Sequence, residues 1–173
     1  MLQGRMDSEG LRALQAPLKE RYRNDSASAL LTLSADGELG AEGVACSVQT
    51  GRALVEAGLH PYSGGDGTLA CSGDMLLQAL VACAGVTMRA VAVNLGMAIG
   101  GHVLAEGDLD FRGTMGVDRE APVGFREIRL SFELETDASE EELEKLVALT
   151  ERYCVVYQTL AGVPVSVSHS VSR

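Results

Sequence analysis

Residues 75–95 form an almost uninterrupted apolar stretch, and this stretch constrains the fold more than any other part of the chain. Its polar members are few: Gln78, Thr87, Arg89 and Asn94. The pattern predicts a helix whose apolar residues cover most of the circumference. A helix that is apolar nearly all round must be buried nearly all round.

The ends of this predicted helix carry the expected signals. Ser72 or Asp74 can cap its start, and Gly96 suits the left-handed residue that follows a helix. A membrane span is the alternative, but only the ten residues 79–88 lie between Gln78 and Arg89, against the ~20 that a bilayer needs. A chain of 173 residues would struggle to enclose a helix about 32 Å long. We therefore expect burial by a second copy, in an intertwined homodimer.

Two further helices are predicted. One covers residues 8–22, interrupted by Pro17, and the other begins at Ser139, forms a capping box with Glu142 and ends at Gly162. Alternating patterns and turn signals, Asp36-Gly37 among them, predict strands over 29–34, 43–49, 52–56, 101–113, 125–135 and 163–171.

The fold class that follows is α+β, with antiparallel sheets packed around two long central helices, because strands joined by short turns favour antiparallel pairing. We expect an N-terminal helical extension over residues 1–27 and a single domain over 28–173.

The composition excludes several classes of partner. The net charge of -10 argues against nucleic acid and against an anionic membrane surface, because both need clustered Lys and Arg. Residues 1–25 hold no apolar signal stretch, so we expect a cytoplasmic protein. We expect no metal and no other cofactor, because His60, His102 and His169 share no ligand spacing.

Four cysteines, at positions 46, 71, 83 and 154, form no CxxC pair. Cys83 lies in the middle of the apolar helix among small residues, and Cys154 lies on the apolar face of the second long helix. Two cysteines on packed faces could meet at disulfide distance, but their spacing alone favours two buried packing residues. Cys71, just before the helix start, could be a reactive thiol, and Cys46 is expected in the core.

Two segments, 79–88 (ALVACAGVTM) and 151–160 (ERYCVVYQTL), resemble the two cysteine motifs of the OsmC/Ohr family of osmotically inducible and organic hydroperoxide resistance proteins. Residues 107–113 and 162–165 are similar to its middle and last strands, so the resemblance covers about residues 28–171. It implies an α+β homodimer with two central helices, and thiol peroxidase chemistry that protects against oxidative stress.

The resemblance also implies roles for two of the cysteines. Cys83 matches the peroxidatic cysteine, whose thiolate attacks the O–O bond of a small organic hydroperoxide to form a sulfenic acid. Cys154 matches the resolving cysteine, which condenses with it to a disulfide that a dithiol reductant reopens.

Attack requires a thiolate, and active family members stabilise it with an Arg held by a Glu ahead of the cysteine helix. Here Gly73 stands at the position of that Glu, and Asp74, nine residues before Cys83, matches the acidic residue of other OsmC-like branches and is the candidate partner of the Arg. On a regular helix Asp74 lies opposite Cys83, so it can serve only if the helix starts later or the partner subunit intervenes. Arg52 is the candidate cation, and Arg89 and Arg112 are competitors. The alternative to an enzyme is a catalytically weak OsmC-like protein that binds an apolar small molecule at the dimer interface.

Overall fold

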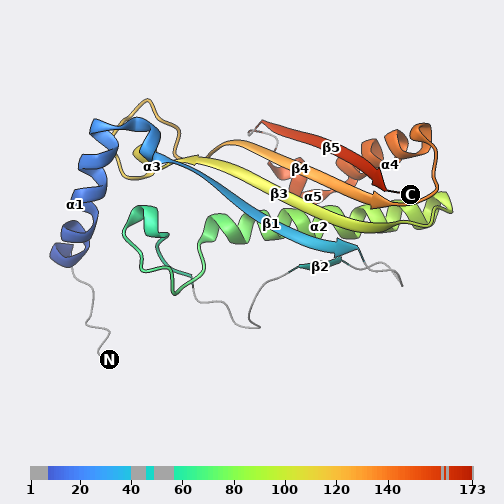
Figure 1. Ribbon diagram of the computed structural model, residues 1–173, viewed down its shortest axis with the longest axis horizontal. Coiled ribbons are helices and arrows are strands. Elements are labelled where there is room, and N and C mark those ends of the chain that lie inside the picture. Colours follow the sequence, from blue (N-terminus) through green and yellow to red (C-terminus); the bar gives the residue numbers. More distant parts are fainter. Residues whose placement is uncertain (1–7, 40–45, 49–56, 161, 163, 173) are drawn as a thin grey trace. The chain divides into compact units, whose positions relative to one another are not determined.

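The computed structural model describes residues 8–39, 46–48, 57–160, 162 and 164–172 (Figure 1). Its helices are α1 (Ser8–Asn24), α2 (Ser72–Leu95), α3 (Phe111–Thr114), α4 (Glu140–Tyr153) and α5 (Val155–Thr159), with short 3-10 turns at Ser26–Ala29 and Pro61–Ser63. Its strands are β1 (Leu30–Leu39), β2 (Cys46–Val48), β3 (Gly100–Asp110), β4 (Phe125–Glu135) and β5 (Val165–Ser172). The predicted α+β class is confirmed.

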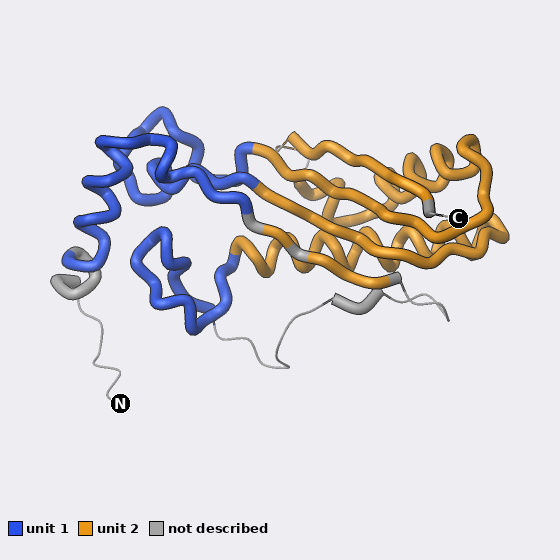
Figure 2. The backbone as a smooth tube through the Cα atoms, viewed as in Figure 1, with its two compact units in different colours: residues 1–32, 54–72, 108–126 blue, residues 33–53, 73–107, 127–173 orange. Residues whose placement is uncertain are grey.

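The chain divides into two compact units (Figure 2). Unit 1 holds residues 1–32, 54–72 and 108–126, and unit 2 holds residues 33–53, 73–107 and 127–173. Both units are discontinuous in sequence. The expected boundary between residues 27 and 28 stays a prediction.

Unit 1 has its own small core. Tyr22 of α1 is buried and donates its hydroxyl hydrogen to the Tyr62 carbonyl oxygen at 2.6 Å. Around it pack Ala29, Phe111 and Met115. The predicted N-terminal helix therefore exists, but the expected interruption at Pro17 is wrong, because α1 continues through Pro17 to Asn24.

The sheet is mixed, with strand order β2-β1-β3-β4-β5. β1 and β2 pair antiparallel, but β4 and β5 pair parallel, with Ile128 opposite Val165. The expectation of purely antiparallel sheets is therefore wrong. The reason is the connection: α4 and α5 form a crossover between β4 and β5, and a crossover returns the chain to the same end of a sheet.

The turn predicted at Asp36-Gly37 is also wrong, because β1 continues through both residues. Gly37 pairs with Val48 of β2 and is buried in the sheet. Of the two strands predicted next, β2 falls within 43–49, whereas residues 52–56 lie outside the described residues.

The predicted central helix is α2, and it begins at Ser72, slightly earlier than expected. Asp74 therefore lies inside the first turn and not at the cap. Gly96 follows the helix with φ +70°, as predicted. By length and composition α2 could cross a membrane, a property that a buried core helix shares, and half of its most apolar window is buried.

The burial of α2 is not complete within one chain. The buried side chains are Leu77, Leu80, Val81, Ala84, Met88, Arg89, Val91 and Ala92. Another side of the helix exposes Met75, Leu76, Val86 and Val93. A single copy of the described chain thus leaves an apolar stripe of this helix uncovered.

The second long helix is interrupted. The capping box of Ser139 and Glu142 is confirmed at the start of α4, but the helix stops at Tyr153. Cys154 has ψ 108°, an extended conformation, and α5 begins directly after it. The prediction of two long helices is therefore only half right, and the break falls on a candidate site residue.

Candidate active site

Cys83 and Cys154 are brought together within unit 2. Cys83 lies near the middle of α2 and is half-buried, whereas Cys154, at the break between α4 and α5, is 1% exposed. Both are free thiols, and the Cys154 thiol donates a hydrogen bond to the Cys83 sulfur. This is the pairing that the resemblance implied.

The break at Cys154 supplies further donors to the Cys83 sulfur. The first N–H groups of a helix have no carbonyl partner within it, and here the N–H groups of Val155 and Val156 hydrogen-bond the sulfur of Cys83. The hydroxyl of Thr87, one turn along α2, is a further donor. Hydrogen bonds of this kind stabilise a thiolate more than a thiol.

The two thiols consequently differ in acidity. Burial raises the pKa of Cys83, but the hydrogen bonds from Val156, Cys154, Val155 and Thr87 outweigh it, and the pKa lies below the ordinary thiol value. Burial raises the pKa of Cys154 to about 11, and the neighbouring Cys83 sulfur adds to this effect. Of the two thiols, Cys83 is therefore the more acidic, which is the property that a nucleophilic cysteine needs.

The cation predicted beside Cys83 stays a prediction. Among the described residues, none of the five main influences on this pKa is an Arg or Lys. Arg89 is 6% exposed and donates to the carbonyl oxygen of Ile99 at 2.6 Å, beyond the C-terminal end of α2. Arg52 lies outside the described residues.

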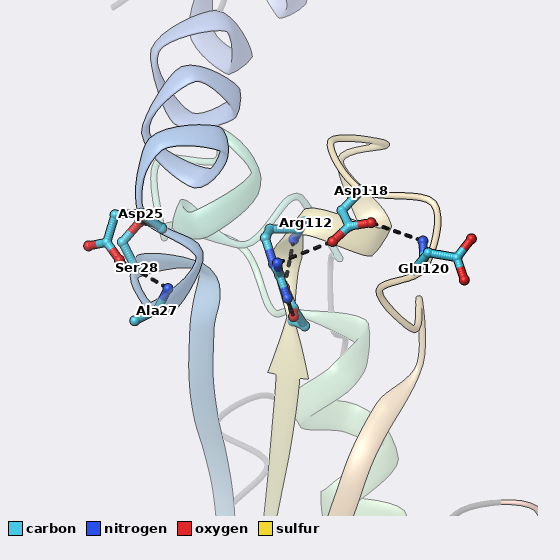
Figure 3. A network of polar contacts seen from close by, with 7 residues as sticks. Asp25, Ala27, Ser28, Arg112, Asp118 and Glu120 are labelled. Atoms are coloured by element: carbon cyan, nitrogen blue, oxygen red, sulfur yellow. Dashed lines mark hydrogen bonds and ion pairs between the residues drawn. The ribbon is translucent and has the colours of Figure 1, made fainter.

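Arg112 belongs to unit 1, where two carboxylates hold it (Figure 3). Its guanidinium lies 2.6 Å from the buried carboxylate of Asp110 and 3.1 Å from that of Asp118. The Arg112 hydrogen bonds keep the pKa of Asp110 below its ordinary value. This arrangement is typical of a structural ion pair that fixes the end of β3.

The structure places Asp74 in the first turn of α2, nine residues before Cys83. Nine steps of ~100° put the two side chains on opposite faces of a regular helix. Its role as the partner of an activating Arg stays a prediction.

An apolar cavity of about 470 Å³ begins one turn of α2 beyond Cys83, at Thr87. It lies between α2 and α4, and its walls are Val86, Thr87, Ala90, Val91, Asn94, Leu95, Leu149 and Tyr153. Thr87 connects the two features, since it both lines the cavity and hydrogen-bonds the Cys83 sulfur. A small apolar molecule in this cavity would contact Thr87, one turn of α2 from Cys83.

Cys71 and His60 lie in unit 1. Cys71 is half-buried and directly precedes α2. His60 caps the 3-10 turn at Pro61–Ser63 and stacks on Phe111, with ring centroids 5.3 Å apart. His60 is thus part of the unit 1 packing. Cys46 lies in β2.

Sequence reasoning missed three donors of the site. Thr87 lies four residues after Cys83, a spacing that puts both on one helix face, so its hydroxyl could have been recognised. The N–H groups of Val155 and Val156 could not, because backbone donors carry no side-chain signature and depend on the break at Cys154.

The sequence model of the OsmC-like protein family matches residues 65–168, which is more than half of the chain and includes both cysteines. The chain belongs to the OsmC-like family. The crystal structure of an OsmC-like protein from Mycoplasma pneumoniae has the same fold, with a TM-score of 0.58 and 19% identity over 83% of this chain and 96% of that one.

Another OsmC-like structure that matches is a hydroperoxide resistance protein from Jannaschia sp. CCS1, with a TM-score of 0.49 and 15% identity over 77% of this chain and 87% of that one. A comparison with curated proteins finds no significant match.

Proposed function

We propose that this OsmC-like protein reduces small organic hydroperoxides through Cys83 and Cys154. The observation that carries the proposal is the hydrogen bond from the Cys154 thiol to a Cys83 sulfur whose pKa is lowered. A peroxidatic cysteine needs a thiolate at neutral pH, and its resolving partner must be within reach. The lowered pKa of Cys83 and the adjacent Cys154 thiol favour both requirements.

The chemistry runs in three balanced steps. The Cys83 thiolate attacks the terminal oxygen of the hydroperoxide, so that an S–O bond forms, the O–O bond breaks and the alkoxide leaves to take a proton from water. The Cys154 thiol then condenses with the Cys83 sulfenic acid, which yields a disulfide and water. A dithiol reductant restores both thiols by exchange and is itself oxidised to a disulfide.

Activation of Cys83 in this proposal comes from hydrogen bonds to its sulfur. Gly73 stands where the family has the Glu that holds the activating Arg. The backbone N–H groups of Val155 and Val156 supply hydrogen bonds to the sulfur that such an Arg would otherwise provide. Donors that are fixed in the fold need no reorganisation when the thiolate forms. An Arg such as Arg52 would add to this effect.

A second copy of the chain is part of the proposal. Leu76, Ala79, Cys83, Val86, Ala90 and Val93 follow one another at spacings of three and four residues, and we call this row the α2 seam. Such spacing is typical of packing between helices, and Val86 and Val93 are 40% and 56% exposed. A homodimer joined along the α2 seam would cover the stripe and enclose the cavity.

We also propose that the protein works in the cytoplasm, with no nucleic acid, membrane or cofactor.

Reaction with one equivalent of tert-butyl hydroperoxide tests the function. We expect the loss of two thiols and a Cys83–Cys154 disulfide in the peptide map, and turnover when dithiothreitol is supplied. A bridge to Cys71 or Cys46, or unchanged thiols, would overturn the proposal.

The apolar cavity favours one alternative function, the binding of an apolar small molecule without chemistry. Binding and catalysis differ in a simple way. A protein that only binds retains its free thiols in the presence of tert-butyl hydroperoxide, and it binds an apolar fluorescent probe equally well when Cys83 is replaced by Ser.

A further inference from the structure

Thr87 is the one described side chain that both lines the apolar cavity and donates a hydrogen bond to the Cys83 sulfur. The Cys154 thiol contacts the same sulfur but is 1% exposed and is not part of the cavity wall. The backbone donors of Val155 and Val156 belong to the start of α5.

The position of Thr87 follows from the helix. Four residues along α2 return to the same face, one turn above Cys83. The cavity continues in the same direction, with Ala90 and Asn94 of α2 on its wall. A hydroperoxide that extends from the cavity to Cys83 would approach along the part of α2 where Thr87 lies, between the cavity and the sulfur.

We propose that Thr87 is a catalytic residue, whose hydroxyl moves its hydrogen bond from the Cys83 sulfur to the departing oxygen of a hydroperoxide held in the cavity. This inference rests on the proposed function and deepens it. As the S–O bond forms, the sulfur loses its negative charge and no longer needs the donor. The charge appears instead on the oxygen that leaves when the O–O bond breaks.

Thr87 gives up no electron and no proton in this step. The sulfur is oxidised from thiolate to sulfenic acid, the hydroperoxide is reduced to an alkoxide, and the alkoxide takes its proton from water. Thr87 contributes a hydrogen bond at the moment when charge develops, and the removal of a donor of this kind in other enzymes lowers rates by about 100- to 1,000-fold.

The test compares two reactions of the same thiolate. Alkylation by iodoacetamide needs the Cys83 thiolate but involves no departing oxygen, whereas reaction with tert-butyl hydroperoxide needs both. Because the thiolate fraction enters both rates equally, it cancels in the ratio of the hydroperoxide rate to the alkylation rate. The ratio therefore reports how well the site stabilises the departing oxygen, independently of the pKa of Cys83.

We expect Thr87→Val, which keeps the shape and removes the hydroxyl, to lower this ratio about tenfold or more. Thr87→Ala should do the same in a less crowded site, and Thr87→Ser, which keeps the hydroxyl, should restore the wild-type ratio. Thr114→Val is a matched control, since Thr114 is an exposed helical Thr of unit 1.

The outcomes separate the two proposals. An unchanged ratio in both Thr87→Val and Thr87→Ala, with wild-type protein that forms the Cys83–Cys154 disulfide, overturns the role of Thr87 and leaves the function standing. Wild-type protein whose Cys83 is alkylated but never oxidised by the hydroperoxide overturns the function, and the role of Thr87 with it.

Discussion

Cys154 donates its thiol hydrogen to the sulfur of Cys83 from the single extended residue that separates α4 from α5. The same residue ends one helix and lets the next begin with its first N–H groups directed at that sulfur. One local departure from helical geometry thus supplies both the resolving thiol and part of the activation of the nucleophile.

The two thiols should react with an alkylating agent in different pH ranges. Because the pKa of Cys83 is lowered and that of Cys154 is raised to about 11, Cys83 becomes a thiolate first as the pH rises. We expect iodoacetamide to modify Cys83 at neutral pH and to leave Cys154 intact there. Mass spectrometry of both peptides between pH 5 and pH 10 measures this, and earlier modification of Cys154 would contradict the assignment.

Replacement of Cys154 should separate its two contributions. Cys154→Ser removes the resolving thiol and keeps a hydroxyl donor, so a sulfenic acid should persist at Cys83 after hydroperoxide treatment, detectable with a dimedone probe. Cys154→Ala also removes the donor, so the pKa of Cys83 should rise further than in the Ser variant. Cys71→Ser added to Cys154→Ser is the control and should change neither property; loss of the sulfenic acid in this double variant would place the sulfenic acid on Cys71.

The close approach of β3 to β4 should make Gly101 irreplaceable. Its φ is +122°, and a Cβ there would lie 2.0 Å from the carbonyl oxygen of Glu133. We expect Gly101→Ala to lower the free energy of unfolding by about 2 to 4 kcal/mol. Gly100→Ala is the adjacent control: its Cβ would meet only the end of the Glu135 side chain, at 3.6 Å. Urea denaturation that gives equal losses for the two variants would contradict this account.

A charge on the α2 seam should separate the copies of the proposed dimer. Val93 is 56% exposed within one chain, and Val93→Glu would place a carboxylate in an apolar contact, where it lacks a partner. We expect sedimentation to show a dimer for the wild type and a shift toward monomer for this variant. Val123→Glu is the control, since Val123 is 66% exposed and lies outside the seam. Wild-type protein that is a folded monomer at micromolar concentration would refute the dimer.

The sequence predicted the parts of the fold that follow from local patterns. α2, the capping box of Ser139 and the span of β4 all rest on periodicity and on caps, which nearby residues determine. The parallel pairing of β4 with β5 was missed because it depends on how a whole crossover returns to the sheet. The continuation of β1 through Gly37 was missed because pairing with Val48 outweighs the turn preference of Asp-Gly.

The candidate site, like the fold, was predicted from the sequence only in part. The cysteine pair was predicted from motifs, whereas the break at Cys154 was not, since the segment from Glu151 to Thr159 contains neither Gly nor Pro. Without that break no sequence argument could place the N–H groups of Val155 and Val156 beside a sulfur. Backbone donors become visible only when the tertiary structure is known.

The sequence separation of the two thiols has a consequence for how the protein withstands heat. A bond between Cys83 and Cys154 would close a loop of about 70 residues that contains β3, β4 and α4, and a closure of that size stabilises a fold by about 4 kcal/mol. The oxidised, disulfide form of the protein would then melt at a higher temperature than the reduced form. Each oxidation by a hydroperoxide would stabilise the fold, and each reduction by a dithiol would remove that stabilisation.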